Sequence, residues 1–373
     1  MTQARTGRVS ARLPDFPWDR IASYAAVARA HPDGIVDLSI GTPVDPTPAV
    51  AQQALAAASD SPGYPTTLGL EVTRQAVVDW LARAHGVTGL GLDGVLPVVG
   101  SKELIAGLPT QLGVGPGHLV AIPEVAYPTY EVGAVLAGAE VVATDEPEAL
   151  ERTPALVYLN SPSNPTGRVL GPDRLRALVG WARDRGVLLV SDECYLECCW
   201  EASAVSVLHP EVCGGSHEGL LAVHSLSKRS NLAGYRCACV VGDPAVVGEL
   251  LAVRKNLGLM MPTPQQRVMA AVLDDDAHAA EQHARYAARR DVLRTALEGA
   301  GFRVDHSEAS LYLWSTRLVD GRPEPCLDTV AWLAERGVLV APGDFYGAAG
   351  ADHVRVAFTA TDERIAAAAA RLT

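Results

Sequence analysis

The chain has 373 residues, of which 48% are hydrophobic, and it contains 34 glycines and 25 prolines. This length and composition are typical of an α/β protein with two domains. The formal net charge of −12 argues against nucleic acid or an anionic membrane as the main partner. No apolar run reaches the about 18 residues of a membrane helix, and residues 1–12 lack an apolar signal core, so we expect a cytoplasmic protein.

The first 45 residues predict an arm and a short strand. Residues 13–20 carry two prolines and aromatic side chains, which favours a segment lying across another surface, and residues 24–30 have helical spacing. Residues 35–43 predict a short strand that breaks at Gly41. Glycine there would let the backbone approach a ligand closely, but it is also a common turn residue.

The next segment contains a candidate anion site. Helices are predicted at 48–58 and 71–85, and the strand predicted at 94–99 is followed by Gly100 and Ser101, which open another helix. The free amides and the positive end of the helix dipole would favour an anion at this point. The same residues also suit an ordinary helix cap, and both interpretations stay open on this pattern alone.

The middle of the chain repeats a strand–helix unit. Strongly apolar strands are predicted at 118–123, 155–160, 186–191 and 220–224, about 30 residues apart, with a helix at 172–185 between two of them. Such strands are typical of a mostly parallel sheet that helices cover on both faces.

The last third of the chain has a different pattern. A long helical stretch at 263–299 precedes a strand pair near 302–304 and 311–314, a helix near 329–336, a strand at 353–358 and an alanine-rich closing helix. We therefore predict a large α/β domain over residues 46–262. The N-terminal segment, 1–45, is predicted to join 263–373 in a smaller α+β domain.

The seven cysteines are an odd number without metal-site spacing. Cys194, Cys198 and Cys199 are crowded together, whereas Cys237 and Cys239 alternate within a strand-like run and would face one side. These spacings match no common zinc pattern. We therefore predict buried, reduced thiols and no metal ion.

Polar side chains follow four of the predicted strands where each strand ends. They are Tyr127, Asn164, Asp192, Ser225 and Lys228. The carboxyl ends of the strands in an open parallel sheet form one crevice. A single aspartate at a strand end is usually a cap, but five such groups indicate a shared site.

Lysine is scarce in this chain, since only Lys102, Lys228 and Lys255 occur among 31 basic residues. Chemistry that needs an amine able to lose its proton and attack a carbonyl cannot use arginine. Lys228 lies at the predicted crevice, Lys102 suits a phosphate or surface role, and Lys255 lies in a helix-like run. Pyridoxal phosphate needs such a lysine, an acid at its ring nitrogen, donors for its phenolic oxygen, an aromatic ring and a cationic phosphate cup.

Three segments resemble hallmark segments of the class I and II pyridoxal-phosphate aminotransferases of fold type I. These are residues 225–228 with Arg236 eight residues further on, residues 164–167 and residues 192–195. The resemblance extends along almost the whole chain. It implies a fold with a large, mostly parallel sheet domain and a smaller α+β domain.

The resemblance implies a catalytic role for Lys228, Asp192 and Tyr195. Lys228 would form the Schiff base with the cofactor and shuttle the proton, and Asp192 would pair with the ring nitrogen. Asn164 and Tyr195 would bond the phenolic oxygen, and Tyr127 would stack on the ring.

Further residues are implied around the cofactor phosphate and the substrate. The phosphate would be held by Gly100, Ser101, Lys102, Ser225 and Arg236. Tyr64 would reach the phosphate of the neighbouring subunit, which implies a homodimer with shared sites. Arg355 would bind the α-carboxylate of a small amino or oxo acid, beside Asn164 and the backbone of Gly41.

Within the family, residues 13–19, 37–46 and 227–236 resemble the N-succinyldiaminopimelate aminotransferases of bacterial lysine synthesis. Those enzymes exchange an amino group between glutamate and N-succinyl-2-amino-6-oxopimelate. An enzyme that binds a substrate with two distal carboxylates should have a second cationic group, for which Arg20 and Arg229 are candidates.

Several alternatives stay open or are disfavoured. The same motifs suit an aspartate, alanine or aromatic aminotransferase, or a carbon–sulfur β-lyase. A cofactor-binding regulatory domain without turnover is disfavoured, because both Lys228 and Arg355 are present. A nicotinamide oxidoreductase is weaker still, since the glycine-rich residues 89–94 precede a strand instead of joining a strand to a helix.

Overall fold

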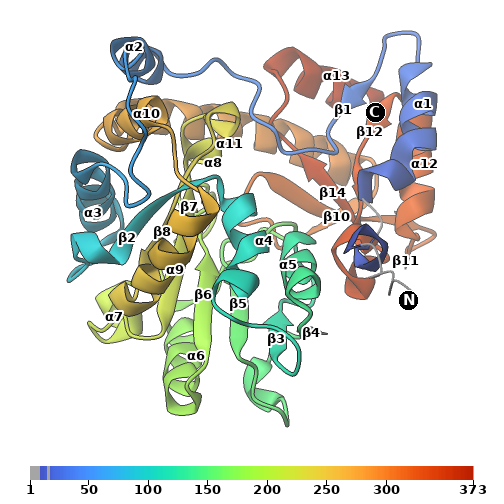
Figure 1. Ribbon diagram of the computed structural model, residues 1–373. Helices are drawn as coiled ribbons and strands as arrows, with labels where there is room; N and C mark the ends of the chain where they lie inside the picture. Colours follow the sequence, from blue (N-terminus) through green and yellow to red (C-terminus); the bar gives the residue numbers. More distant parts are fainter. Residues whose placement is uncertain (1–8, 15–16, 373) are drawn as a thin grey trace, which may run out of the picture.

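The computed structural model describes residues 9–14 and 17–372, and Figure 1 shows two packed parts with the N-terminal segment against the second. A seven-stranded sheet forms the centre of the larger part. Its strands are, in spatial order, β2 (Val95–Val99), β8 (Cys237–Gly242), β7 (Leu220–Ser225), β6 (Leu188–Asp192), β5 (Leu156–Asn160), β3 (Leu119–Ile122) and β4 (Glu140–Ala143). β8 alone runs in the direction opposite to the other strands of this sheet, so the predicted α/β fold with a mostly parallel sheet is confirmed.

The strands of this sheet send alternate side chains into two apolar cores, one on each face. Along β5, Leu156 and Tyr158 enter one core, and Val157 and Leu159 enter the other. The first core also contains side chains of α4 (Ser101–Gln111), α5 (Thr129–Ala137) and α9 (Pro244–Leu257). The second contains side chains of α2 (Ala49–Ala57), α3 (Glu71–His85), α6 (Pro172–Arg185), α7 (Pro210–Cys213) and α10 (Thr263–Leu273).

The smaller part is built on β10 (Tyr312–Val319). This strand pairs antiparallel with β9 (Phe302–Asp305), β11 (Arg322–Pro323) and β14 (Val354–Ala357), and β14 pairs with β13 (Ala341–Pro342). Its core contains side chains of α11 (Ala277–Gly299), α12 (Cys326–Glu335) and α13 (Asp362–Leu372). The strand pair predicted near 302–304 and 311–314 is therefore confirmed.

The N-terminal segment packs against the C-terminal third of the chain. α1 (Ala22–Arg29) packs on α12, and β1 (Val36–Asp37) pairs in parallel with β12 (Val338–Leu339). Short 3₁₀ turns occupy Val9–Arg12, Pro17–Ile21, Leu92–Gly94, Pro147–Ala149, Ala233–Tyr235, Gly343–Tyr346 and Ala348–Gly350.

The single helical stretch predicted at 263–299 is in fact two helices, α10 and α11, which three consecutive aspartates separate. Asp275 Oδ1 accepts a hydrogen bond from the Ala277 amide at 2.8 Å, because short acidic side chains compete with the helix backbone and favour caps. α10 packs on α2 and α3 in the larger part, whereas α11 belongs to the core of the smaller part. The division into two domains stays a prediction, and these contacts favour a boundary after α10.

All seven cysteines are free, and Cys237 and Cys239 enter the same core, as their alternation predicts. Within the described part of the chain, no helix has the length and apolar character needed to cross a bilayer.

Candidate active site

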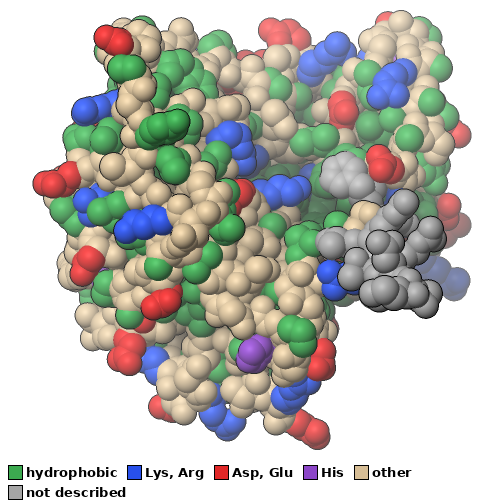
Figure 2. Space-filling model, in the orientation of Figure 1, with side chains coloured by type: hydrophobic (Ala, Val, Ile, Leu, Met, Phe, Trp, Pro, Cys, Tyr) green, Lys and Arg blue, Asp and Glu red, His purple; other side chains and the backbone are tan. Residues whose placement is uncertain are grey.

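A pocket of about 260 Å³ lies at the carboxyl edge of the large sheet, where the two parts of the molecule meet. Figure 2 shows a hollow on this face with Lys and Arg side chains inside it. The pocket brings together most of the predicted site residues, namely Gly41, Ser101, Lys102, Tyr127, Asn164, Asp192, Tyr195, Ser225, Lys228, Arg236 and Arg355. Gly100 lies directly beside it, against Arg236.

Lys228 reaches the pocket from α8 (Leu226–Arg229), a single turn of helix that follows β7. Ser225 ends the strand and caps this turn, because its hydroxyl oxygen accepts a hydrogen bond from the Ser227 amide at 3.3 Å. Lys228 Nζ donates to the carbonyl oxygen of Gly41 at 2.5 Å. The amine therefore bridges from the large sheet to the segment that follows β1.

Asp192 lies buried on the floor of the pocket, at the end of β6. Its Oδ2 accepts from the Tyr130 hydroxyl at 2.8 Å, and its Oδ1 accepts from the Cys194 amide at 3.1 Å. Burial raises the pKa of the Asp192 carboxyl above its ordinary value, although hydrogen bonds from Cys194 and Tyr130 act in the other direction. A buried carboxylate with neutral donors suits a cationic ring N–H as its missing partner.

Arg236 and Gly100 form a fitted pair at one edge of the pocket. Gly100 has φ +88°, and a Cβ built on it would lie 2.0 Å from Arg236 Nη2. Arg236 Nη1 donates to the Ala233 carbonyl at 3.0 Å, and none of the ion pairs in the described part of the chain uses this guanidinium. The amino end of α4 begins at Ser101. A free guanidinium beside a helix N-terminus fits a phosphate group.

Lys102 lies in the first turn of α4 and contributes a second cation at this edge. Its Nζ lies 3.4 Å from the Tyr127 hydroxyl and 5.5 Å from the centroid of that ring. Lys102 and Tyr127 therefore line the pocket together, as expected for residues beside a phosphorylated ring.

Arg355 is a buried guanidinium that projects from β14, and its exposed fraction is 2%. It donates to Asn164 Oδ1 at 2.9 Å and to the Ser39 carbonyl at 2.6 Å, while its Nε has no hydrogen-bond partner. Its guanidinium carbon lies 4.1 Å from the centroid of the Tyr312 ring. Among the described residues it forms no ion pair, so a buried positive charge is left for a carboxylate that enters the pocket.

Three contributors were missed by sequence reasoning. Tyr130 holds Asp192, and Asn160 Oδ1 accepts from the Asn164 amide at 2.7 Å. Asn160 ends the strand predicted at 155–160, and Tyr130 lies beyond the strand predicted at 118–123, so the strand-end pattern could have identified them. Tyr312 comes from the smaller part, and its hydroxyl lies 2.9 Å from that of Tyr195. No local pattern marks Tyr312, because only the packing of β10 brings it to the pocket.

Tyr64 does not line this pocket. Its side chain is 99% exposed in the single chain. A large aromatic ring left in water suits a contact outside this chain, and the predicted role of Tyr64 in a neighbouring subunit stays a prediction.

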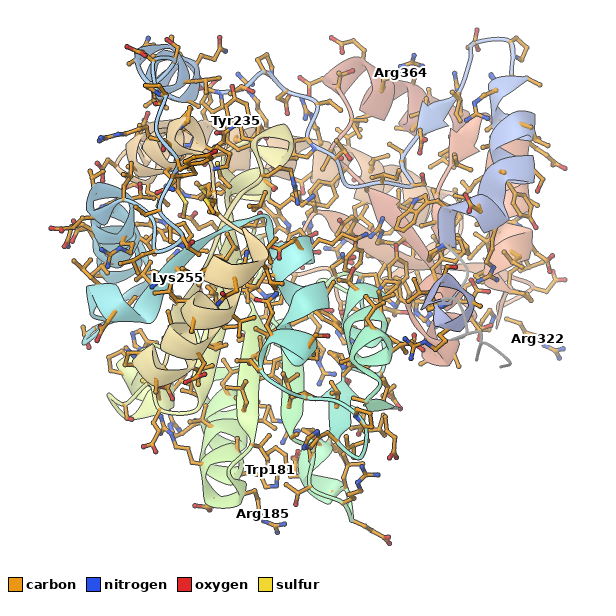
Figure 3. All side chains as sticks on the ribbon, in the orientation of Figure 1. Trp181, Arg185, Tyr235, Lys255, Arg322 and Arg364 are labelled. Atoms are coloured by element: carbon orange, nitrogen blue, oxygen red, sulfur yellow. The ribbon has the colours of Figure 1, made fainter. Side chains whose placement is uncertain are left out.

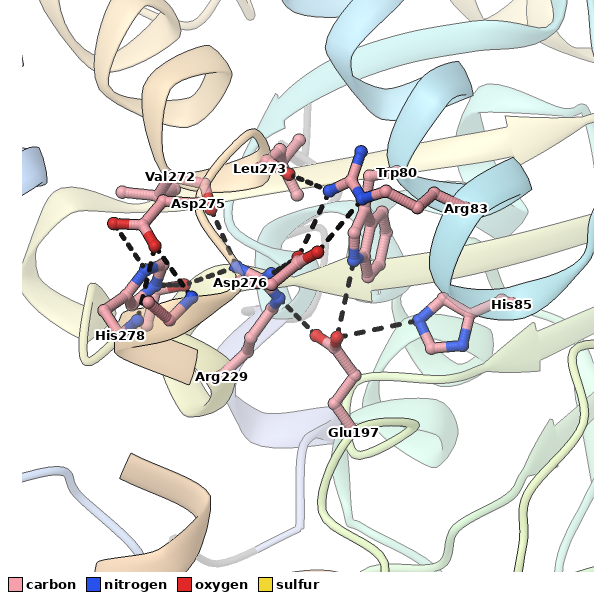
Figure 4. Close-up of polar contacts among 12 residues, drawn as sticks. Trp80, Arg83, His85, Glu197, Arg229, Val272, Leu273, Asp275, Asp276 and His278 are labelled. Carbon is pink, nitrogen blue, oxygen red and sulfur yellow. Dashed lines mark hydrogen bonds and ion pairs between the residues drawn. The ribbon is translucent and has the colours of Figure 1, made fainter. Parts of the chain in front are cut away.

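The two arginines proposed for the distal carboxylates both form ion pairs, but only one of them is buried. Arg20 donates to Asp344 at 2.7 Å, outside the pocket. Arg229 is buried and pairs with Glu197 and Asp276, in the network that Figure 4 shows. Arg229 points away from Lys228 because successive residues of α8 face different sides. The prediction is therefore wrong for Arg229, whereas for Arg20 it stays a prediction.

Comparisons with known proteins agree with this geometry. A family model described as aminotransferase class I and II matches residues 33–372. The chain is 63% identical over 368 residues to a probable aminotransferase of Mycobacterium tuberculosis, covering 98% of this chain and 87% of that protein. It is 59% identical over 362 residues to a 4-dedimethylamino-4-oxo-anhydrotetracycline transaminase of Streptomyces rimosus, covering 97% of this chain and 99% of that protein. A solved structure of a probable N-succinyldiaminopimelate aminotransferase of Thermus thermophilus has a TM-score of 0.86 at 28% identity, over 96% of this chain and 99% of that one.

The fold and the pocket define an α/β enzyme of fold type I that binds pyridoxal phosphate. The chain belongs to the class I and II aminotransferase family. The resemblance drawn from three short segments is thereby confirmed at the level of the family. The finer similarity to N-succinyldiaminopimelate aminotransferases is not established, since the relatives at 63% and 59% identity carry other names.

Replacing Gly100 with alanine should weaken cofactor binding. The added methyl group would displace the Arg236 guanidinium, and the positive φ disfavours alanine. We expect the Kd for pyridoxal phosphate, titrated into cofactor-free protein, to rise at least about tenfold. Gly180→Ala in α6 is the matched control, because a Cβ there meets nothing within 4 Å. An unchanged Kd for Gly100→Ala would contradict this account of the phosphate cup.

Proposed function

We propose that this aminotransferase moves an amino group from glutamate to N-succinyl-2-amino-6-oxopimelate, the substrate pair that segments 13–19, 37–46 and 227–236 favour. The main support for a substrate with a carboxylate is Arg355, which lines the same pocket as Lys228. Its guanidinium is buried and has no ion-pair partner in the described part of the chain. The similar structure of a probable N-succinyldiaminopimelate aminotransferase of Thermus thermophilus supports this acceptor.

The proposed roles of the chain's own residues follow from their positions. Pyridoxal phosphate, when bound, supplies an electron sink for the charge left at the substrate α-carbon. Arg355 binds and orients the α-carboxylate through its planar fork. The amine of Lys228 takes up and returns the α-proton. Asp192 keeps the ring nitrogen protonated, and Tyr127 packs beside the ring.

We also propose a cytoplasmic homodimer with shared sites. The 99% exposed ring of Tyr64 supports a contact with a second copy of the chain. Gly100, Ser101, Lys102, Ser225 and Arg236 would hold the phosphate from within one subunit.

A second candidate acceptor is a ring ketone. The Streptomyces rimosus relative, at 59% identity over 99% of its length, is named for a 4-oxo-anhydrotetracycline substrate. Such a ketone is part of a ring system and carries no carboxylate on the reacting carbon. The two candidates therefore differ in their need for Arg355.

Replacing Arg355 with methionine separates these candidates. We expect kcat/KM for glutamate, and for any α-keto acid acceptor, to fall about 10²-fold, as loss of a charge-assisted hydrogen-bond pair implies. Activity with a ring-ketone acceptor, measured after loading the amino group by other means, should fall much less. Arg322→Met, an exposed change on β11 that Figure 3 labels, is the control and should leave all rates unchanged.

The direct test is a glutamate half-reaction followed by a panel of acceptors. We expect the succinylated oxopimelate to give the highest kcat/KM. A wide preference for oxaloacetate, phenylpyruvate or the ring ketone would overturn the proposed acceptor but leave the family assignment intact. Elimination of a sulfur leaving group without amino transfer would identify a β-lyase.

A further inference from the structure

The residues that follow Lys228 are fixed to a helix of the smaller part. Ser230 Oγ lies 2.9 Å from His278 Nε2. Asn231 Nδ2 donates to Gln282 Oε1 at 2.8 Å. Ser230 and Gln282 are buried, so water competes little for these bonds. The chain just beyond the lysine therefore lies against the amino-terminal half of α11.

The same glutamine also fixes the segment that carries Gly41. Gln282 Nε2 donates to Asp45 Oδ2 at 2.8 Å. Arg289, seven residues further along α11, donates to both oxygens of Asp45, each at 2.7 Å. Burial acts to raise the pKa of Asp45, but the hydrogen bonds from Arg289 and Gln282 lower it below its ordinary value, so the carboxylate stays ionised.

These contacts form a closed network of residues that includes the Lys228 amine. Gly41 lies four residues before Asp45, and its carbonyl oxygen accepts from Lys228 Nζ. Lys228 lies three residues before Asn231. The amide of Gln282 is thus the point at which the lysine segment and the Gly41 segment are joined through α11.

The polarity of this amide is fixed. A carboxylate only accepts hydrogen bonds, so the NH₂ group of Gln282 must face Asp45. Its carbonyl oxygen must then face the Asn231 NH₂ group. Both ends of this buried side chain are used, and Asp45 excludes the opposite orientation. Asn231 is held in the matching orientation, with its oxygen accepting from the Tyr286 hydroxyl at 3.1 Å.

We propose that Gln282 is a positioning residue for the transamination, because it sets the placement of the Lys228 amine relative to the Gly41 backbone. Proton transfer depends on such placement, and an error of about 1 Å can cost 10²-fold in rate. Gln282 does not line the pocket and touches neither substrate nor cofactor sites directly. The inference rests on the proposed role of Lys228, but not on the identity of the acceptor.

The test uses a change that keeps the shape of the side chain and reverses its hydrogen-bonding character. In Gln282→Glu, a carboxylate oxygen replaces the NH₂ group that lies 2.8 Å from Asp45, so two negative charges meet in a buried site. In Asp45→Asn/Gln282→Glu only one negative charge is left between the two positions, and the asparagine NH₂ can donate to the introduced glutamate. Arg289 Nη1, which donates to the same Asp45 oxygen as Gln282, must then turn to the introduced carboxylate, while its Nε keeps Asp362. Gln75→Glu is the matched control, since Gln75 also donates to an aspartate, Asp79, at 2.8 Å, but on the exposed face of α3.

We expect kcat of the glutamate half-reaction in Gln282→Glu holoenzyme to fall about tenfold, with a smaller change in KM. The kcat of the double variant should be at least about threefold higher than that of Gln282→Glu, because the two like charges no longer meet. Backbone amides of residues 39–45 should exchange with deuterium faster in cofactor-free Gln282→Glu and return toward normal in the double variant. Gln75→Glu should change none of these.

Unchanged kcat in Gln282→Glu would overturn the inference, as would a double variant no better than the single one. A loss of melting temperature with kcat per folded molecule unchanged would show a structural role only and would also overturn it. The exchange measurement needs no turnover. It therefore tests the joining of the two segments even if glutamate proves not to be the donor, a result that would instead overturn the proposed function.

Discussion

Replacing Lys228 with alanine should reduce turnover at least about 10⁴-fold, the upper range for loss of a general acid–base. The purified natural protein should be yellow, and its absorbance should change when glutamate is added. The variant should lose that change, because no other amine lies at the carboxyl edge of the sheet beside Gly41 in the described part of the chain apart from Lys102, which faces Tyr127. Stopped-flow absorbance and coupled turnover assays measure both effects.

Two further variants separate this chemistry from a simple loss of charge. Lys228→Arg keeps the positive charge, but a guanidinium does not lose its proton, so it should be as inactive as the alanine variant. Lys255→Ala removes an exposed lysine on α9, labelled in Figure 3 away from the pocket, and should retain full activity. Retention of more than about 1% of turnover in Lys228→Ala would show that the lysine is not the catalytic amine.

Replacing Asp192 with asparagine should lower kcat about 10³-fold, the cost of removing a preorganised charge from a buried site. The amide keeps the volume of the carboxylate, can accept from the Cys194 amide and can donate to the Tyr130 hydroxyl. Single-turnover measurements with glutamate report the loss. Glu193→Gln, which alters the neighbouring buried carboxyl outside the pocket, is the control and should retain kcat.

The same replacement, Asp192→Asn, should stabilise the cofactor-free protein although it lowers the activity of the enzyme. The folded-state pKa of Asp192 is raised above its ordinary value of 3.8. The folded protein therefore binds this proton more tightly, and stability is lost as the pH rises through the folded pKa. Cofactor-free Asp192→Asn should melt above the cofactor-free natural protein at neutral pH, and the difference should shrink in acid. A lower melting temperature at neutral pH would contradict the burial argument.

The contacts of Arg229 could not be predicted from the neighbouring sequence. A basic residue next to Lys228 suggests a substrate contact, yet Arg229 turns into the protein and pairs with Asp276 between α10 and α11. The direction of its side chain depends on the one-turn helix α8 and on a carboxylate 47 positions further along the chain. Neither could be derived from the residues around it.

The sequence by itself predicted most strands of the large sheet, although not β4, together with the clustering of polar residues at their ends and the positions of Asn164, Asp192 and Lys228 in one crevice. These features are local, since a buried strand and the polar residue that ends it lie within one short stretch. Tertiary structure decided the rest. Arg355 donates to Ser39 across 316 positions, and Tyr312 reaches Tyr195 across 117. Such long-range contacts form only when the smaller part packs on the edge of the sheet. The burial of apolar surface that drives this packing is spread over many residues, so no short sequence pattern predicts it.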